Sequence, residues 1–500
     1  LKVCGPRADM AIPSRRRQRL RGSGGQVWRI MHLMALCPIA WQSGFAVSPL
    51  VNGMLPPGPP RLRRPSEHRQ AVGKRATGSL EARGFGSGAA RSAAASGASL
   101  PSPPGPWAVP ILGSLSVLWG LLRRVPLPEL LRRLRVRYGP LFLIRTGPVS
   151  QVWVGDPDVL RRVYELPECS GRPVSFKDPF GDFLFLVREP GPAEVIRERQ
   201  TAWLDANLRA DAIGASTEEA MSRLWPLLDG PEPRAWPGTA VRTAMYSAVT
   251  TALLGRECVV SDAELEMLMA ATTEYSEMRA KGKFGKRGAR KGQLPPGATD
   301  IRRIIGGALA RAGRTDSELA LPLVVAASVG GAEIFPTLLQ WIALDLAQRP
   351  AEQEEAARAA ASGDNAALMR CIYAVLRRTA YSVALGPPRK ILADAVVDGV
   401  QLPAGALLFA MHPALVDSAL GRAPPADEDF ASYAFGVGPR ACLGRKLAEA
   451  LLPAALGALL HRYSIALADP AGSNTVRGEL QGQLIRPVDA PALKWEVRGA

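Results

Sequence analysis

One short segment of the chain carries residue types that suit thiolate or metal chemistry. Two glycines and a proline surround Cys442 in the string FGVGPRACLG, residues 435–444, and predict a tight loop. Such a loop brings backbone amides around the sulfur, where they stabilise a thiolate and tune any bound metal. We expect a helix to begin at the cysteine and its dipole to add to that stabilisation. Arg440 can meet an anionic group on the same ligand, and Phe435 can shield the sulfur. A cysteine before a helix is more often a small buried apolar residue, so the surrounding string decides.

That string resembles the haem-binding loop of the cytochrome P-450 family, F-x-x-G-x-R-x-C-x-G. All five fixed positions match, and they are Phe435, Gly438, Arg440, Cys442 and Gly444. By this resemblance Cys442 is the axial ligand of the iron in haem b (iron protoporphyrin IX), and its thiolate pushes electron density to the iron to favour O–O cleavage. The continuation is similar to the mitochondrial branch, because Arg445 and Lys446 follow the last glycine and could face an acidic ferredoxin. A solvated basic pair is the plainer alternative.

The resemblance extends unevenly over residues 101–500. It includes the segments YGPLFLI (138–144), MYSAVTTALLGRE (245–257) and VVDGVQLPAG (396–405). Arg389 lies nine residues before Asp398, which is the spacing at which the family places an arginine for a haem propionate. Because an arginine beside a propionate forms a charge-assisted pair, we assign Arg389 to the cofactor site, with an ordinary surface arginine as the alternative.

The proton-delivery segment of the family, [AG]-G-x-[DE]-T-[TS], is only partly present. Here the segment reads GGAEIF, residues 330–335. Gly331 matches, leaving room for oxygen, and Glu333 matches as the acid, so these two are the candidate catalytic residues. A solvated helix acid is the alternative for Glu333. Ile334 replaces the threonine and cannot donate or relay a proton. Pro336 follows, and an interior proline costs about 3 kcal/mol or kinks a helix.

Two structural motifs of the family are also incomplete. The E-x-x-R motif falls at 374–377, where Arg377 is present but Ala374 replaces the glutamate. Only 23 residues (412–434) separate Met411 from Phe435, and this short loop lacks the third member of the usual triad. An uncompensated buried arginine is costly, so Arg377 should have another partner or face water. The W-x-x-x-R element lacks its tryptophan, and Val195 with Arg199 is its best placement.

The remaining pattern predicts the elements that must position these residues. A basic amphipathic helix is expected at Leu127–Arg137, and Ala/Leu-rich helices dominate from about residue 200. The longest should run roughly over 316–348, with a capping box of Thr315 and Glu318 at its start and Arg349-Pro350 at its end. Strands are expected at 140–144, 152–154 and within 396–409. The fold class is therefore mainly α with minor β-sheets. By the resemblance, this is the cytochrome P-450 fold with a long central helix and a Cys-loop haem site.

The charge belongs mostly to the first hundred residues, which we take as a leader before a catalytic domain at 101–500. Residues 1–100 hold 16 Lys+Arg against 3 Asp+Glu, a surplus of 13 out of the chain's +17, and residues 30–60 carry no charged side chain. An Arg-, Ser- and Ala-rich, acid-poor leader is typical of an organellar transit peptide, and a weak membrane anchor or a plain unstructured extension are alternatives. Mitochondrial, inner-membrane-associated localisation is expected, with the endoplasmic reticulum membrane or a plastid as alternatives. The leading Leu1 suggests a fragment or a processed product.

Composition excludes several classes of protein. Six scattered cysteines without a CxxC pair exclude a disulfide scaffold and zinc ribbons, and the basic leader lacks the interleaved aromatics of a nucleic-acid-binding segment. A basic cluster at 279–291 could contact acidic lipid as a peripheral membrane contact, although a solvated loop is favoured.

Three functions stay open. The first is a haem-thiolate monooxygenase that acts on a lipophilic, sterol-like substrate with O2 and with electrons from a ferredoxin or a flavoprotein reductase. The second is a hydroperoxide isomerase or dehydratase of the same fold, which needs no threonine relay. The third is a degenerate, non-catalytic haem protein or a faulty gene model.

Overall fold

The structure is a computed structural model of the chain. It describes residues 100–499 except 124, 126, 174–189, 209, 259, 281–295, 380–387, 412–433, 470–475 and 482–483. Residues 1–99 of the predicted leader, most of the basic cluster at 279–291 and most of the short loop before Phe435 lie outside the described residues.

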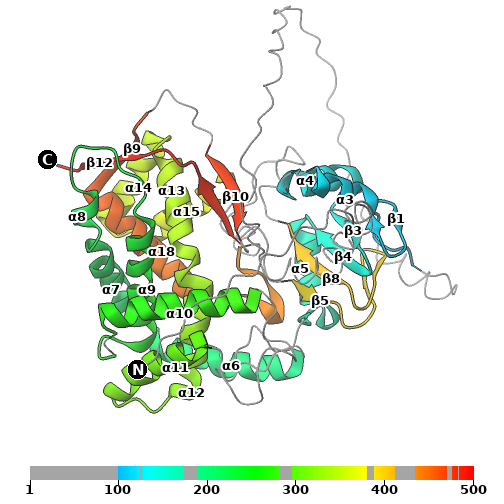
Figure 1. The fold of residues 1–500 in the computed structure, drawn as a ribbon, viewed down its shortest axis with the longest axis horizontal. Helices are drawn as coiled ribbons and strands as arrows, with labels where there is room; N and C mark the ends of the chain where they lie inside the picture. The colour runs from blue at the N-terminus through cyan, green and yellow to red at the C-terminus, as the bar shows by residue number, and fades with distance from the viewer. Residues whose placement is uncertain are drawn as a thin grey trace, which may run out of the picture.

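Helices make up most of the described chain, as the sequence predicts, and they gather on one side of a smaller sheet-containing part (Figure 1). The α-helices are α3 (Leu115–Leu122), α4 (Leu127–Tyr138), α5 (Pro157–Glu165), α6 (Pro190–Asn207), α7 (Ala210–Ser222), α8 (Trp225–Leu228), α9 (Gly238–Leu254), α10 (Asp262–Ala280), α11 (Pro296–Arg311), α12 (Ser317–Ala327), α13 (Ile334–Leu346), α14 (Pro350–Ser362), α15 (Asn365–Thr379) and α18 (Arg445–Arg462). Short 3-10 turns occupy Pro167–Cys169 and Gly438–Arg440.

The predicted long helix is present but changes its winding in the middle. A π-helical turn, Ser328–Ala332, connects α12 to α13, so the helical stretch runs from 317 to 346. Pro336 lies in the first turn of α13, directly after the π turn. Because proline lacks an N–H and collides with the preceding turn, a local change of winding beside it is expected.

The predicted capping box is wrong. Asp316 is the N-cap of α12, and its side chain makes no capping bond. Its carboxylate instead accepts hydrogen bonds from Arg314 and, at 2.7 Å, from the indole of Trp203. In the described residues, only the stretch 317–346 is long and apolar enough to cross a membrane, and most of it is buried inside the protein, as in a core helix.

A six-stranded sheet has the order β1-β2-β3-β4-β8-β5 and is antiparallel except for the parallel pair β4–β8. Its strands are β1 (Ala108–Val109), β2 (Gly113–Ser114), β3 (Leu141–Thr146), β4 (Val149–Val154), β8 (Leu407–Ala410) and β5 (Arg389–Lys390). Three two-stranded sheets are formed by β6 (Ala395–Val397) with β7 (Val400–Leu402), β9 (Tyr463–Leu467) with β12 (Leu493–Val497), and β10 (Arg477–Gln481) with β11 (Leu484–Val488). The predicted strands are confirmed.

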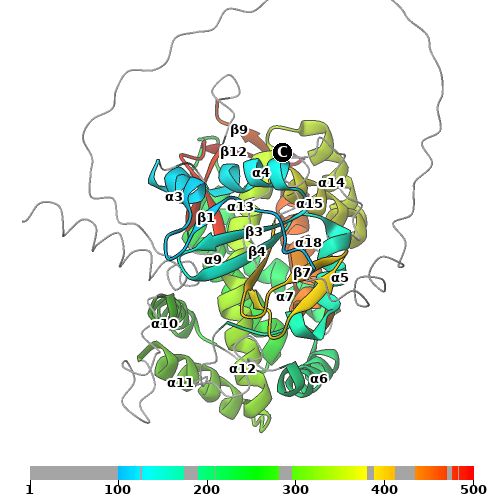
Figure 2. The ribbon, with the colours of Figure 1, turned by 90° about the vertical axis from the view of Figure 1, so that its right-hand side faces the viewer.

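Three apolar clusters hold these layers together. The largest is helical and is centred on α9, α13 and α18, which lie side by side in Figure 2. Apolar residues surround α9 almost completely, as expected of a helix buried on every side. The two smaller clusters cover the faces of the large sheet, one beneath α3 and α4 and the other beneath α5. Across the β4–β8 pair, Trp153 stacks on Phe409 with ring centroids 4.6 Å apart.

Candidate functional site

The backbone of the Cys442 loop has the tight geometry that its glycines predict. Gly436 and Gly438 have φ values of +71° and +70°, in the left-handed region that glycine enters at little cost. The amide of Cys442 donates a 2.7 Å hydrogen bond to the carbonyl of Phe435, which closes the loop. A Cβ atom on Gly438 would lie 2.6 Å from the carbonyl oxygen of Tyr164, at the end of α5. The second glycine therefore also lets the loop pack against α5.

The sulfur of Cys442 lies among protein atoms that act on it in opposite ways. Desolvation raises the pKa of the thiol, whereas the backbone N–H of Gly444 and the charge of Arg197 lower it. The residue as a whole is nevertheless exposed. Cys442 is therefore exposed as a residue although its thiol group is desolvated. It is not the small buried apolar cysteine that the sequence left as the alternative. The expectation that a helix begins at the cysteine is wrong, because α18 begins at Arg445 and Gly444 is its N-cap.

Arg389 and Arg440 are buried beside this loop. Arg389 is 2% exposed and donates to the carbonyls of Tyr164 and Val437, both at 2.8 Å. Its guanidinium also lies 3.4 Å from the centroid of the Tyr164 ring. Burial lowers the pKa of Arg389 to about 10. Arg440 is 7% exposed and donates to the carbonyl of Ser170 at 2.9 Å. Neither residue is an ordinary surface arginine.

The sequence interpretation missed a third arginine at the loop. Arg197 on α6 donates a 2.6 Å hydrogen bond to the carbonyl of Ala441, immediately before Cys442. Val195 and Arg199, which the sequence favoured for this helix, are both exposed, so that placement is wrong by two residues. The signal was weak, because the position four residues before Arg197 is an alanine and not the tryptophan that marks the motif.

Glu333 is half-buried and tied to α9. Its Oε1 atom accepts hydrogen bonds from Arg242 Nε and from the hydroxyl of Tyr246, each at 2.8 Å. Burial lowers the pKa of Arg242, but the hydrogen bond and the charge of Glu333 outweigh it, so the pKa of Arg242 is raised. Desolvation and the Glu333 carboxylate raise the pKa of Tyr246. Glu333 is therefore an ion-paired carboxylate and not a solvated acid.

The structure joins most of the predicted site residues and leaves two apart. Five of them form the Cys442 loop itself, and the edge strand β5 brings Arg389 to this loop. The described contacts connect Glu333 to α9, and Gly331 lies in the π turn, where a Cβ atom would approach the Phe335 ring to 3.3 Å. The catalytic roles of Gly331 and Glu333 therefore stay predictions.

The two basic residues after Gly444 are exposed and already paired within the chain. Arg445 contacts Glu449 at 2.8 Å, and Lys446 contacts Asp205. On α15, Arg377 of the incomplete E-x-x-R motif is half-buried and has a partner, as the cost of an uncompensated arginine requires.

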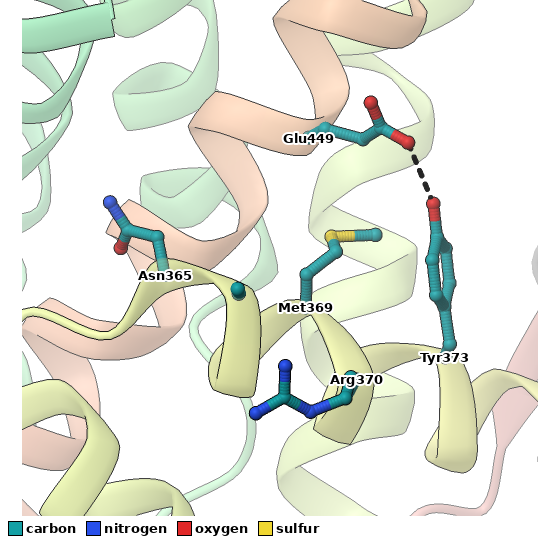
Figure 3. Close-up of a pocket in the computed structure, with 6 residues that line it drawn as sticks. Asn365, Met369, Arg370, Tyr373 and Glu449 are labelled. Atoms are coloured by element: carbon teal, nitrogen blue, oxygen red, sulfur yellow. Dashed lines mark hydrogen bonds between the residues drawn. The ribbon is translucent and has the colours of Figure 1, made fainter. Parts of the chain in front are cut away.

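A solvent-open recess of about 380 Å³ lies between α15 and α18. It is lined by Asn365, Ala366, Met369, Arg370, Tyr373 and Glu449. Figure 3 shows the hydroxyl of Tyr373 directed at the Glu449 carboxylate, to which it donates a 2.9 Å hydrogen bond. None of the predicted site residues lines this recess, so it is separate from the Cys442 site.

Comparison with known proteins bears on the Cys442 segment most directly. A family model described as Cytochrome P450 matches residues 422–487, a stretch that contains the loop, α18 and β9. Over this segment the chain is similar to the cytochrome P450 family. It is 24% identical over 202 residues to cytochrome P450 1A2 of Cavia porcellus, covering 37% of this chain and 38% of that protein. It is 38% identical over 102 residues to cytochrome P450 105C1 of a Streptomyces species, covering 19% of this chain and 27% of that protein.

A third relative matches a shorter stretch. Premnaspirodiene oxygenase of Hyoscyamus muticus is 45% identical over 62 residues, covering 12% of this chain and 11% of that protein. The chain thus spans less than two-fifths of the length of each of these relatives. The mitochondrial branch stays a prediction.

The residues around Cys442 fit the cytochrome P450 cofactor, a thiolate-ligated haem. Cys442 is exposed as a residue, and the Gly444 amide and Arg197 both favour the thiolate form of its sulfur. Arg389 uses two of its five N–H donors on carbonyl groups in the contacts described above, so donors are left for a propionate. In the described residues there is no cluster of three or more histidine, cysteine or carboxylate side chains that would hold a different metal.

Proposed function

We propose that the chain is a haem-thiolate monooxygenase that inserts one atom of O2 into a lipophilic substrate. The observation that carries this proposal is the Cys442 loop, in which an accessible cysteine receives a backbone amide and lies beside three arginines. Haem b, when bound, would supply the iron at which dioxygen is activated. Cys442 would hold it through the sulfur, with Arg389 and Arg440 toward the propionates and Phe435 beside the sulfur.

The chain's own residues have distinct tasks in this proposal. Gly444 and Arg197 favour the thiolate form of the Cys442 sulfur against the desolvation that raises its pKa, because an N–H dipole and a positive charge both stabilise an anion. Arg242 and Tyr246 fix Glu333 through its Oε1 atom, so Oε2 is the oxygen at which this residue would take up and release a proton. Ile334 has no hydroxyl, and a water molecule must carry the proton onward from Glu333.

The substrate and the electron donor are proposed from one relative's name and from two exposed basic residues of α18. Premnaspirodiene oxygenase is by its name an oxygenase, and a sterol-like or other lipophilic substrate follows the mitochondrial resemblance of the loop. Arg445 and Lys446 are exposed on α18, next to the Cys442 loop, where an acidic ferredoxin could exchange their present partners. A flavoprotein reductase is the alternative donor. Mitochondrial localisation rests on the composition of the leader.

A haem protein of the same fold without oxygenase turnover is the second candidate. Ala374 removes the glutamate of the E-x-x-R motif, and Ile334 removes the relay hydroxyl. Glu333 is in addition committed to an ion pair with Arg242. The Cys442 loop thus keeps the residues of the haem-binding motif, whereas the proton-delivery segment and the E-x-x-R motif each lack one. A hydroperoxide isomerase or dehydratase would also tolerate Ile334.

The deciding experiment is the absorption spectrum of the full chain loaded with haem, reduced and exposed to carbon monoxide. A strongly red-shifted Soret band that is lost in Cys442→Ser, but kept in the control Cys371→Ser, is the expected result. A spectrum that both variants leave unchanged would overturn thiolate ligation by Cys442. Turnover of a lipophilic substrate with a ferredoxin system would then establish the oxygenase. Turnover of a lipid hydroperoxide without an electron donor would establish the isomerase or dehydratase. If neither assay shows turnover, the non-catalytic haem protein is the function that remains.

A further inference from the structure

The side chain of Tyr164 is enclosed at the end of α5, beside the Cys442 loop. The helix begins at a side-chain cap, because Asp156 accepts hydrogen bonds from the backbone amides of Asp158 and Val159. The apolar face of α5 then packs Tyr164 into the cluster on the large sheet, where the residue is 8% exposed. The cap and the packing together fix the position of the Tyr164 ring.

The guanidinium of Arg389 lies on the face of the Tyr164 ring. Its central carbon is 3.4 Å from the ring centroid, a distance at which an approach along the ring edge would overlap the ring atoms. The other arginine–aromatic contacts in the described residues lie at 4.7 to 5.8 Å. Both side chains are almost completely buried, so water does not screen the attraction between the cation and the negative face of the ring.

The backbone of Tyr164 holds the same guanidinium. The Tyr164 carbonyl is among the last four of α5, which have no partner inside the helix, and it accepts a 2.8 Å hydrogen bond from Arg389 Nη1. A positive charge is also favoured at the C-terminal end of a helix dipole. Arg389 Nη2 donates to the carbonyl of Val437 at 2.8 Å. Arg389 is therefore fixed by two carbonyl groups and one aromatic ring.

These contacts do not neutralise the charge of Arg389. In the part of the chain that the structure describes, its partners are the two carbonyl groups and the ring, and no carboxylate is paired with it. Burial lowers the pKa of Arg389 to about 10, and the charges of Arg440 and Arg197 act in the same direction. A buried cation is stabilised when an anionic group pairs with it. The arrangement therefore fits a ligand that bears a carboxylate, such as a haem propionate.

The ring and the guanidinium also meet the Cys442 loop at one point. A Cβ atom on Gly436 would lie 3.9 Å from the Tyr164 ring and 4.0 Å from Arg389 Nη2. A Cβ atom on Gly438 would lie 2.6 Å from the Tyr164 carbonyl oxygen. A displacement of the ring would therefore change the position of Arg389 against the loop.

We propose that Tyr164 is a positioning residue of the cofactor site, whose ring holds Arg389 in place to pair with a propionate of haem. The inference rests on the haem site of the proposed function, and it adds a residue that lies outside the Cys442 motif. In this role the ring acts through Arg389. A residue that only filled the core would act independently of Arg389, and this difference can be measured.

Haem release from the full chain tests the role of the ring. Tyr164→Leu removes the aromatic face and should transfer haem to a scavenger protein roughly ten-fold faster, whereas Tyr164→Phe keeps the face and should keep the slow rate. The haem reduction potential should shift to lower values in Tyr164→Leu only, because a positive charge held near the haem favours its reduced form. The control Leu160→Ala, a buried position on the same helix, should lower the melting temperature without either change. Equally fast haem release in Tyr164→Phe and Tyr164→Leu would overturn the role of the ring.

A double-mutant cycle with Arg389 separates positioning from packing. In the Arg389→Met background, Tyr164→Leu should add little to haem release or to the loss of melting temperature, since the partner of the ring is already absent. Additive effects would overturn the proposal in favour of a packing role. If Tyr164→Leu does not fold, the longer Tyr164→Met enters the same cycle.

The failure of the proposed function would be distinguishable from the failure of this inference. If the unchanged chain binds no haem, the proposed function is wrong, and the melting cycle of the full chain without haem decides the role of Tyr164. Coupling between Tyr164 and Arg389 would then support the ring as the group that holds Arg389, and additive effects would overturn it.

Discussion

The guanidinium of Arg197 donates a 2.6 Å hydrogen bond to the carbonyl oxygen of Ala441, 244 residues later in the chain. This bond attaches α6 to the Cys442 loop. The same charge lowers the pKa of the Cys442 thiol, against the desolvation that raises it. Burial in turn lowers the pKa of Arg197. One arginine therefore supports both the conformation of the loop and the thiolate form of its sulfur.

Replacement of Arg197 should loosen the cofactor. Arg197→Leu removes the bond to Ala441 and the favourable charge, so haem should transfer to a scavenger protein roughly ten-fold faster, as expected for the loss of one charged hydrogen bond. Arg199→Leu is the matched control, because Arg199 is exposed on the same helix. The rate is followed by the Soret absorbance of the full chain. Equal haem loss in the two variants would contradict a role for Arg197 at the loop.

Three glycines of the loop should respond differently to alanine. Gly438→Ala meets the Tyr164 carbonyl at 2.6 Å at a φ of +70°, and should cost about 2 kcal/mol or more of stability. A Cβ atom on Gly436 would meet no atom closer than 3.9 Å, so in Gly436→Ala the left-handed φ alone should cost about 1 kcal/mol. Gly444→Ala would contact only the Cys442 sulfur at 3.7 Å and should be tolerated in folding. Urea titrations of the variants measure this order, and any other order would contradict the loop geometry.

The Arg242–Glu333 pair should show coupling in a double-mutant cycle. Glu333→Ala leaves a half-buried guanidinium and the Tyr246 hydroxyl without their acceptor, at a cost of about 1–3 kcal/mol. Arg242→Met in the same background should cost much less than it does alone. Additive effects in thermal unfolding would show that the pair contributes no stability.

If Glu333 also serves the reaction, Glu333→Ala slows turnover while haem binding stays intact, and an unchanged rate would remove it from the mechanism.

The stability of the central helix should depend on acid pH through Asp316. The pKa of this carboxyl is lowered from 3.8, first by the hydrogen bond from Arg314, which outweighs desolvation, and then by the hydrogen bond from Trp203. A lowered pKa contributes stability that is complete above the unfolded value and is lost as pH falls through the folded value. Asp316→Asn should therefore lower the melting temperature at pH 7 and have little effect near pH 2. The control Asp158→Asn removes an exposed ion pair and should change the melting temperature little at pH 7.

Local sequence was sufficient for the features that depend on local physics. The positive φ values of Gly436 and Gly438 follow from the glycines of the loop, and the strands β3, β4, β6 and β7 follow from short apolar runs and turns. The long helix was predicted within two residues at each end, because its apolar pattern continues through Gly330 and Gly331. The resemblance to the cytochrome P450 family also followed from five residues at fixed spacing.

Only the tertiary structure decided which distant groups meet at these elements. Nothing near Glu333 in the sequence indicates that Arg242 and Tyr246 hold its carboxylate, because both come from a helix about ninety residues earlier. Arg197 was missed for the same reason. Its partner is a backbone carbonyl, which every residue has, so the sequence does not indicate which carbonyl it contacts. The buried side of α3 was equally hidden, because its apolar residues lie on more than one side of the helix and give no sign of which side the core will cover. Periodicity and spacing fix local conformation, but long-range partners are selected by packing.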